Sequence, residues 1–175
     1  MAVAENVLKS ANLFVGGYGF AGNLKEVKLP ELSIKLEQFR AGGMDAPISL
    51  DKGMEELVVT FSTTKHCVET LNLFGVSKDG GVPLIVKGSL ESYDGTITPV
   101  TVNMTGKVVK IAPGAWSEGG ESSTEYTVNL SYYKYTQDGK EVHEIDVLNM
   151  KRIINGVDQL AQHRANLGLV AQQNG

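Results

Sequence analysis

The sequence predicts a mainly β, antiparallel protein, and three observations support that prediction. Apolar and polar residues alternate with a period of two in several stretches between residues 83 and 136, as in strands with one buried and one wet face. The pair Asp138-Gly139 supplies the positive φ angles of a two-residue hairpin turn, so a strand should lie on each side of it. Twenty glycines with only 7% aromatic residues favour turns and bends over a helical bundle.

Composition narrows the class of protein before any element is placed. A chain of 175 residues with 42% hydrophobic residues fits one domain, can bury a sizeable core, and is too apolar to be disordered. A net charge of −4 argues against a strongly basic surface that grips nucleic acid. No stretch reaches the roughly 20 apolar residues of a membrane span, and the first 16 residues lack the pattern of a secretion signal. A single cysteine, Cys67, excludes an internal disulfide framework and fits a reducing compartment.

Alternation places the expected strands at residues 32–39, 57–61, 83–93, 100–108, 123–136 and 140–146. In the first of these, Ile34 and Leu36 should face the core. In the long strand at 123–136, Tyr132 continues the inward series of Tyr126, Val128 and Leu130. The opposite, polar faces form three rows: Lys87, Ser89 and Glu91; Thr101, Asn103, Thr105 and Lys107; and Glu125, Thr127, Asn129 and Ser131.

Two helices and several loops complete the expected layout. Thr63 or Thr64 could cap a helix over residues 65–74, where Val68, Leu71 and Phe74 recur at three-residue spacing before Gly75. Asp158 could cap a second helix over residues 159–167, closed by Gly168. Residues 16–22 and 112–123 should be loops, and residues 40–53 a long, mostly structureless connection. Such a long loop is usually functional.

The chemical motifs all favour structural readings. Residues 17–22 match the dinucleotide pattern G-x-G-x-x-G, but no helix of useful length follows, so a glycine-rich hairpin or loop is expected. The three histidines and Cys67 lack zinc-ligand spacing, and Cys67 reads as a small buried residue rather than a reactive thiol. The carboxylates of residues 55–56 and 141–146 read as solvated faces. We therefore expect no catalytic residues, no metal and no cofactor.

Several strings in register resemble the major tail tube proteins of contractile-tailed phages, and also the tube subunits of R-type pyocins. The landmarks span about residues 12–169 and are LPEL at 29–32, LEQFRAGGMDAP at 36–47, SYYK at 131–134, DGKE at 138–141, EID at 144–146 and INGVDQL at 154–160, followed by Arg164 and the run Asn166 to Leu169. The tail at residues 170–175 runs past the expected end of the family and receives no role.

The resemblance implies a single tail tube domain over residues 1–175, built of two packed antiparallel sheets with a flanking helix and a short C-terminal helix. It implies no catalysis, and rings of six copies whose inner sheets join in a barrel around a lumen. Expected partners are further copies of the chain, a sheath protein, baseplate and terminator proteins, and double-stranded DNA in the lumen if the particle is a phage. The expected location is a virion tail or a tailocin.

Two surfaces follow as expectations. Ring stacking is assigned to the loop at residues 40–53, with the candidates Arg40, Ala41, Gly42, Gly43, Met44, Asp45, Ala46 and Pro47. The lumen is assigned to the polar rows on residues 87–91 and 101–107, and less firmly to the row on residues 125–131. A monomeric β-sandwich that binds a ligand on its polar faces is the alternative, and an enzyme ranks third.

Overall fold

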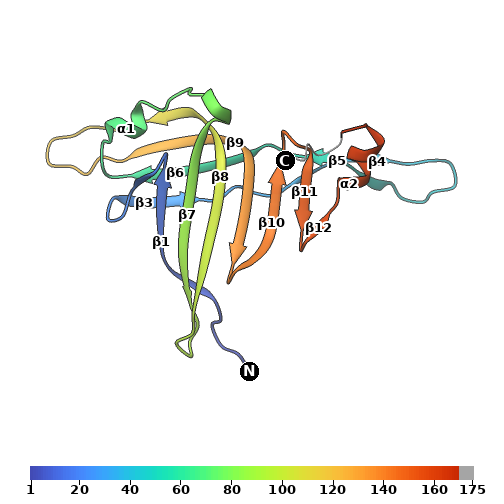
Figure 1. Cartoon of the computed structure of the whole chain (residues 1–175), viewed down its shortest axis with the longest axis horizontal. Helices are drawn as coiled ribbons and strands as arrows, with labels where there is room; N and C mark the ends of the chain where they lie inside the picture. The colour runs from blue at the N-terminus through green and yellow to red at the C-terminus, as the bar shows by residue number, and fades with distance from the viewer. Residues whose placement is uncertain (170–175) are drawn as a thin grey trace, which may run out of the picture.

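The computed structural model describes residues 1–169, and a bent antiparallel sheet dominates them (Figure 1). Its strands are β1 (Val7–Val15), β2 (Tyr18–Gly19), β3 (Leu24–Lys28), β6 (Leu57–Thr63), β7 (Val82–Glu91), β8 (Ile97–Ala112), β9 (Thr124–Gln137), β10 (Lys140–Asp146), β11 (Lys151–Ile154) and β12 (Val157–Asp158). A second, two-stranded sheet holds β4 (Ile34–Phe39) and β5 (Ile48–Met54). The mainly β, antiparallel prediction is confirmed. The predicted tail at residues 170–175 lies outside the described residues.

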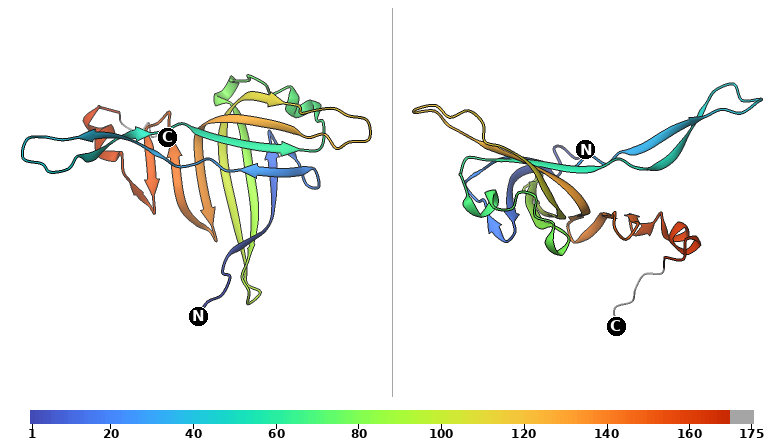
Figure 2. Two further views of the ribbon diagram at one scale, coloured as in Figure 1. Left: turned by 180° about the vertical axis from the view of Figure 1, so that it is seen from behind. Right: turned by 90° about the horizontal axis from the view of Figure 1, so that it is seen from above.

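The long strand β9 turns the main sheet into two layers. Its first half pairs with β6, and its second half pairs with β10, while β8 runs along its other side throughout. Order in the first layer is therefore β2, β1, β7, β8, β9, β10, β11 and β12, and β6 with β3 forms the second layer behind it (Figures 1 and 2). The two layers enclose the core, as β sheets with one apolar face must.

Apolar side chains from both layers meet in this core. Leu84, Val102 and Met104 of the first layer are buried opposite Val59 of β6 and Val128 of β9. A run of aromatic rings ties the layers together: Tyr18 to Phe20, Phe20 to Phe61, and Phe61 to Tyr126, with the last pair stacked at 4.9 Å between ring centroids. The inward residues predicted from alternation on β7, β8 and the first half of β9 are buried.

A β-bulge corrects the predicted alternation on β9. The register with β8 shifts after Leu130, so that Gly106 pairs with Leu130 while Thr105 pairs with Tyr132. Because an extra residue reverses the side of every residue after it, Tyr133 is buried and Tyr132 is only half-buried. The prediction that Tyr132 continues the inward series was wrong.

The region around residues 34–54 also differs from its prediction. Residues 48–54 form β5, which pairs with β4 in a hairpin that projects from the body, called the arm here (Figures 1 and 2). Only its tip, residues 40–47, is without strand structure. Ile34 and Leu36 are exposed rather than inward, since the second layer ends at β3 and leaves the arm with no body beneath it.

Both helices are shorter than predicted. Helix α1 (Val68–Leu71) begins after Cys67 and has no side-chain cap, and η1 (Lys78–Gly80) follows it. Val68, Leu71 and Phe74 are exposed, and α1 instead buries Thr70 and follows the buried Cys67. Helix α2 (Ala161–Asn166) starts two residues later than expected, because Asp158 lies in β12. Gly75 and Gly168 adopt the positive φ angles expected after the helices.

Three turns form as expected. Asp138 and Gly139 have φ angles of 51° and 75° and join β9 to β10, and the polar segment 113–123 is a loop between β8 and β9. Gly16 and Gly17 join β1 to β2. In the described part of the chain, no helix has the length and apolar character needed to cross a membrane.

Candidate assembly surfaces

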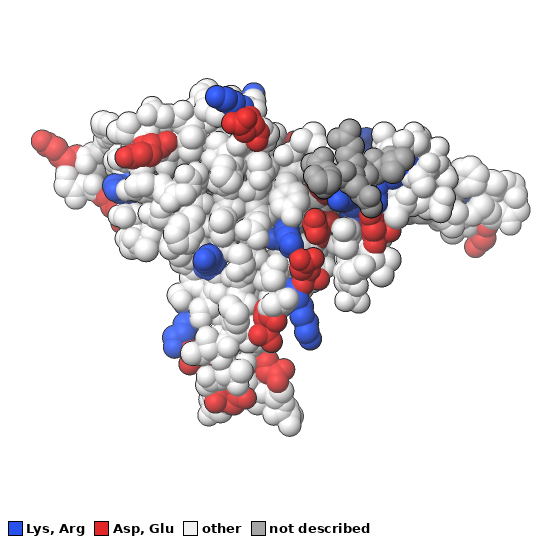
Figure 3. Space-filling model, in the orientation of Figure 1, with Lys and Arg blue, Asp and Glu red and all other residues white. Residues whose placement is uncertain are grey.

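The side of the first layer that faces away from the core, called the polar face here, is largely polar and is interrupted by an apolar patch of Phe14, Pro83 and Ile85. Cross-strand pairing aligns Ser10 with Ser89, Asn12 with Lys87, and Lys87 with Thr101, and paired residues share a face. It is the side turned to the viewer in Figures 1 and 3, where charged side chains are scattered over its centre. The structure therefore brings two of the predicted polar rows together on one surface.

Sequence reasoning missed part of this face. Beyond the bulge, Tyr132, Lys134 and Thr136 join it, because they pair with Thr105, Asn103 and Thr101 of β8. Strand β1, which was not predicted, adds Ser10 and Asn12. The sign of the bulge in β9 was the break in alternation at Ser131-Tyr132-Tyr133. In the structure Ser131 and Tyr132 both avoid the core, and Tyr133 enters it.

Two lysines on the polar face are held by their neighbours. Lys134 Nζ lies 2.8 Å from Glu141 Oε1, and this carboxylate raises the pKa of Lys134 above its usual range. Lys87 Nζ lies 5.7 Å from the centre of the Phe14 ring, within the range of a cation–π contact. The Glu141 carboxylate therefore offsets the charge of Lys134, whereas Lys87 keeps its charge above the Phe14 ring.

The third predicted row continues from the end of the second, because Asn129 pairs with Lys107. Glu125, Thr127 and Asn129 lie on the first half of β9, beside β6 of the second layer. Their side chains point away from the core, and strand pairing aligns Asn129 with Lys107, and Thr127 with Thr60 and Lys110. Lys107 lies at the upper end of the polar face, next to the bulge.

The arm carries the eight predicted stacking residues at its tip. Arg40 Nε donates to the Met44 carbonyl oxygen at 3.1 Å, and the Met44 N–H donates to the Ala41 carbonyl oxygen at 3.2 Å. Below the tip, Phe39 pairs with Ile48, and Leu50 lies on the same side. These three apolar side chains are exposed, so one side of the arm has an apolar surface that nothing in residues 1–169 covers.

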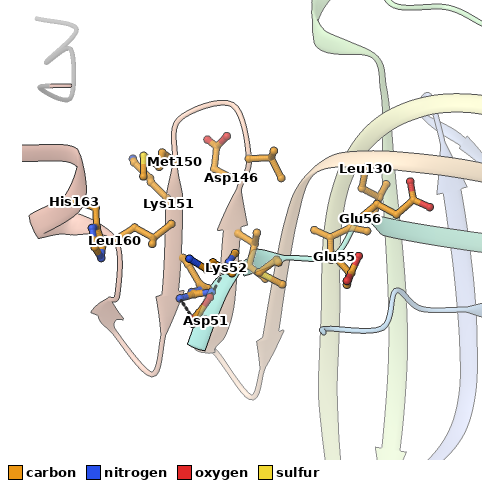
Figure 4. A pocket seen from close by; sticks show the side chains of 16 residues that line it. Asp51, Lys52, Glu55, Glu56, Leu130, Asp146, Met150, Lys151, Leu160 and His163 are labelled. Atoms are coloured by element: carbon orange, nitrogen blue, oxygen red, sulfur yellow. Dashed lines mark hydrogen bonds and ion pairs between the residues drawn. The ribbon is translucent and has the colours of Figure 1, made fainter. Parts of the chain in front are cut away.

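A pocket of about 610 Å³ lies at the root of the arm, between β5, the turn from β10 to β11, and α2 (Figure 4). Arg152 Nη2 donates to Asp51 Oδ2 at 2.8 Å, and the Gly53 N–H donates to Asp51 Oδ1 at 2.8 Å. The hydrogen bond from the Gly53 N–H has the larger effect, and that from Arg152 the next, in holding the pKa of Asp51 below its usual range. The ion pair fastens the arm to β11 across 101 residues of sequence.

The remaining motifs have structural roles. Residues 17–22 form the end of the β1–β2 hairpin and the turn into β3, as expected. Cys67 is buried and its Sγ donates to Glu69 Oε2 at 3.0 Å. Within residues 1–169, no three His, Cys, Asp or Glu side chains gather as a metal site.

Comparison with known proteins identifies the family. Residues 5–168 match the family described as phage tail tube protein FII. The chain belongs to this family. It is 36% identical over 166 residues to the tail tube protein of Escherichia phage P2, covering 93% of this chain and 96% of that protein. It is 31% identical over 150 residues to the major tail tube protein of Serratia phage KSP20, covering 85% and 86%.

Solved structures of contractile systems share the fold. A chain of the extended-state sheath–tube complex of an extracellular contractile injection system, PVC, superposes with a TM-score of 0.55 at 12% identity, covering 72% of this chain and 87% of that chain. The predicted tail tube identity is confirmed: this protein is a structural tube subunit of a contractile tail, located in a virion tail or tailocin particle.

The structure explains one string that carried the tail tube resemblance. Asn155 and Gly156, with φ angles of 51° and 77°, turn β11 into β12. Asp158 then accepts hydrogen bonds from the Leu160 N–H and from Arg164 Nη2, while Arg164 Nη1 donates to the Met150 carbonyl oxygen at 2.9 Å. This set of contacts, called the C-terminal clamp here, holds α2 of the tail tube protein against the edge of the main sheet.

Proposed function

We propose that six copies of this tail tube protein, each acting as one domain over its whole length, close into a ring whose lumen is lined by the polar face. The observation that carries the proposal is a wide, largely polar face that no other element of residues 1–169 covers, on a sheet that ends in the short strands β2 and β12. Exposed sheet edges invite pairing with another chain. Joining the ends of neighbouring sheets closes a barrel with the polar faces inward.

The composition of the polar face suits the passage of double-stranded DNA in a phage tail. Each phosphate bound by Lys or Arg adds affinity, and strong binding would slow sliding. Ser89, Thr101, Asn103 and Thr105 are uncharged, while Lys87 and Lys134 are held by Phe14 and Glu141. A lumen-facing Glu91 is likewise paired, with Lys9. In a tailocin, the same wall would line an empty tube that punctures the envelope.

The arm is proposed to make contacts between stacked rings. It projects beyond the body (Figure 2), and every residue of its tip, Arg40 to Pro47, is exposed except the half-buried Met44. Covering the apolar surface of Phe39, Ile48 and Leu50 would stabilise the contact by about 25 cal/mol for each Å² of apolar surface buried. The contractile sheath, a baseplate and a terminator are the proposed further partners of the tube, and the role of the subunit is structural rather than catalytic.

Electron microscopy of the purified protein tests the proposal directly. Negative-stain images should show rings of six copies or stacked tubes, with the baseplate added as a nucleus where long tubes need one. Only featureless monomers under both conditions would contradict it. Replacing residues 41–46 with a short Gly-Ser link should leave a folded chain that forms rings but no tubes.

The lumen assignment has a matched pair of variants. Thr105→Lys adds a charge to the polar face, and Thr127→Lys adds the same charge beside β6 of the second layer. We expect the Thr105 variant to slow DNA ejection from intact particles and the Thr127 variant to leave ejection unchanged. If the Thr127 variant slows ejection and the Thr105 variant does not, the polar face does not line the lumen.

A further inference from the structure

The β7–β8 hairpin ends in an exposed tip of defined shape. The Ser92 N–H donates to the Thr96 carbonyl oxygen at 2.9 Å, and the Thr96 N–H donates to Asp94 Oδ1 at 2.9 Å. The N-terminal segment braces the tip, because the Tyr93 N–H donates to the Ala4 carbonyl oxygen at 3.1 Å. Tyr93 nevertheless remains 84% exposed. A large aromatic side chain held out on a fixed turn is typical of an interface anchor.

A hollow of about 250 Å³ lies at the opposite end of the same hairpin. It is lined by Ser77, Gly80, Gly81, Gly106, Lys107 and Leu148, among others. Its floor carries no side chains, because the backbones of Gly81 and Gly106 pack against each other there. A Cβ on Gly81 would lie 2.4 Å from the Gly106 carbonyl oxygen. Leu148, in the turn between β10 and β11, is 75% exposed at the rim.

The charges at the two ends are complementary. The tip carries Asp94, and the Thr96 N–H lowers the pKa of this carboxyl, which keeps it ionised. Acidic side chains are visible at the lower end of the molecule in Figure 3. The hollow carries Lys107, with Lys78 and Asp79 on the adjacent η1. The hollow and its border therefore have a net positive charge, and neither lysine forms an ion pair with another residue in the range 1–169.

We propose that the tip of one copy docks in the hollow of a second copy in the adjacent ring, an inference that rests on the proposed stacking of rings. Tyr93 covers the bare floor and Leu148, and Asp94 faces Lys107. Tip and hollow are separated by the ten residues of β7, about 30 Å at roughly 3.3 Å per residue. A contact between opposite ends of one molecule is head-to-tail and repeats without limit, as a tube requires. It would supply a second contact between rings, closer to the lumen than the arm.

Disulfide cross-linking tests the contact in the full-length protein. Thr96→Cys at the tip is combined with Ser77→Cys at the hollow, and the two thiols of one copy lie too far apart to bridge. Oxidation of assembled protein should give a ladder of covalent multimers. A matched control combines Thr96→Cys with Ser117→Cys, which is exposed in the loop 113–123, and should give none. Tubes that yield no ladder with the Ser77 pair, or an equal ladder with both pairs, would overturn the inference.

A charge variant provides a second measurement. Asp94→Asn keeps an oxygen that can accept from the Thr96 N–H but removes the charge, and Glu118→Gln makes the same change on the loop 113–123. We expect Asp94→Asn to raise the concentration needed for stacking by about tenfold, equivalent to about 1.4 kcal/mol, and Glu118→Gln to leave it unchanged. Equal behaviour of the two variants in tubes refutes the docking alone. Wild-type protein that forms neither rings nor tubes would refute the proposed function and this inference with it.

Discussion

Tyr126 lies at the centre of the core with a hydroxyl that has no partner, and its replacement by phenylalanine should stabilise the protein. The side chain is 0% exposed, and the hydroxyl oxygen forms no hydrogen bond with any described residue. Burial raises the pKa of Tyr126 above its usual range, as expected for a phenol removed from water. The hydroxyl is therefore a cost that the folded state bears and the unfolded chain does not.

The expected gain follows from the cost of burying an unpaired polar group, about 1–3 kcal/mol from protein mutational data. Tyr126→Phe leaves the ring and its stacking on Phe61 at 4.9 Å in place, so little packing is lost. For a chain of this length, each kcal/mol shifts Tm by about 2–4 °C. We therefore expect Tm to rise by about 2–12 °C.

Thermal unfolding followed by circular dichroism, at a protein concentration below that of assembly, measures the change. Tyr132→Phe is the matched control, because the Tyr132 hydroxyl donates to Glu144 Oε1 at 3.5 Å and its loss should bring no gain. If Tyr126→Phe unfolds at the same temperature as wild type or below it, then the hydroxyl has a partner such as a buried water. The argument from an unpaired group would then be refuted.

Two further predictions concern the C-terminal clamp and the bulge. The Arg164 guanidinium holds the pKa of Asp158 below its ordinary 3.8, so the clamp stabilises the fold above that pH and loses its effect as pH falls through the lowered pKa. Asp158→Asn should cost about 1–2 kcal/mol at neutral pH and show a weaker loss of stability in acid-denaturation curves than wild type. Gly106→Ala should cost about 1–3 kcal/mol, because its Cβ would lie 2.2 Å from the Asn129 carbonyl oxygen; urea unfolding with an unchanged midpoint would contradict this steric argument.

Local rules were enough to predict β7, β8, β9 and β10, whereas the short strands β11 and β12 were not predicted. Alternation identifies β7, β8 and the first half of β9 because each of them covers a core on one side only. The Asp138-Gly139 turn could be read without any tertiary information, since its φ angles are a property of those two residues. The polar rows on β7 and β8, and hence the candidate lumen wall, follow from the same periodicity.

The sequence by itself therefore determined the β class, the β9–β10 hairpin, and the family through strings spread over the chain. Tertiary structure alone decided three features. The bulge at Ser131 redirects Tyr132, the arm leaves Ile34 and Leu36 exposed, and α1 is reduced to a single turn whose apolar residues face outward. In each case the local pattern assumes that apolar side chains find a core within their own chain. Here the register of a neighbouring strand decides the side, and the arm and α1 leave their apolar side chains exposed.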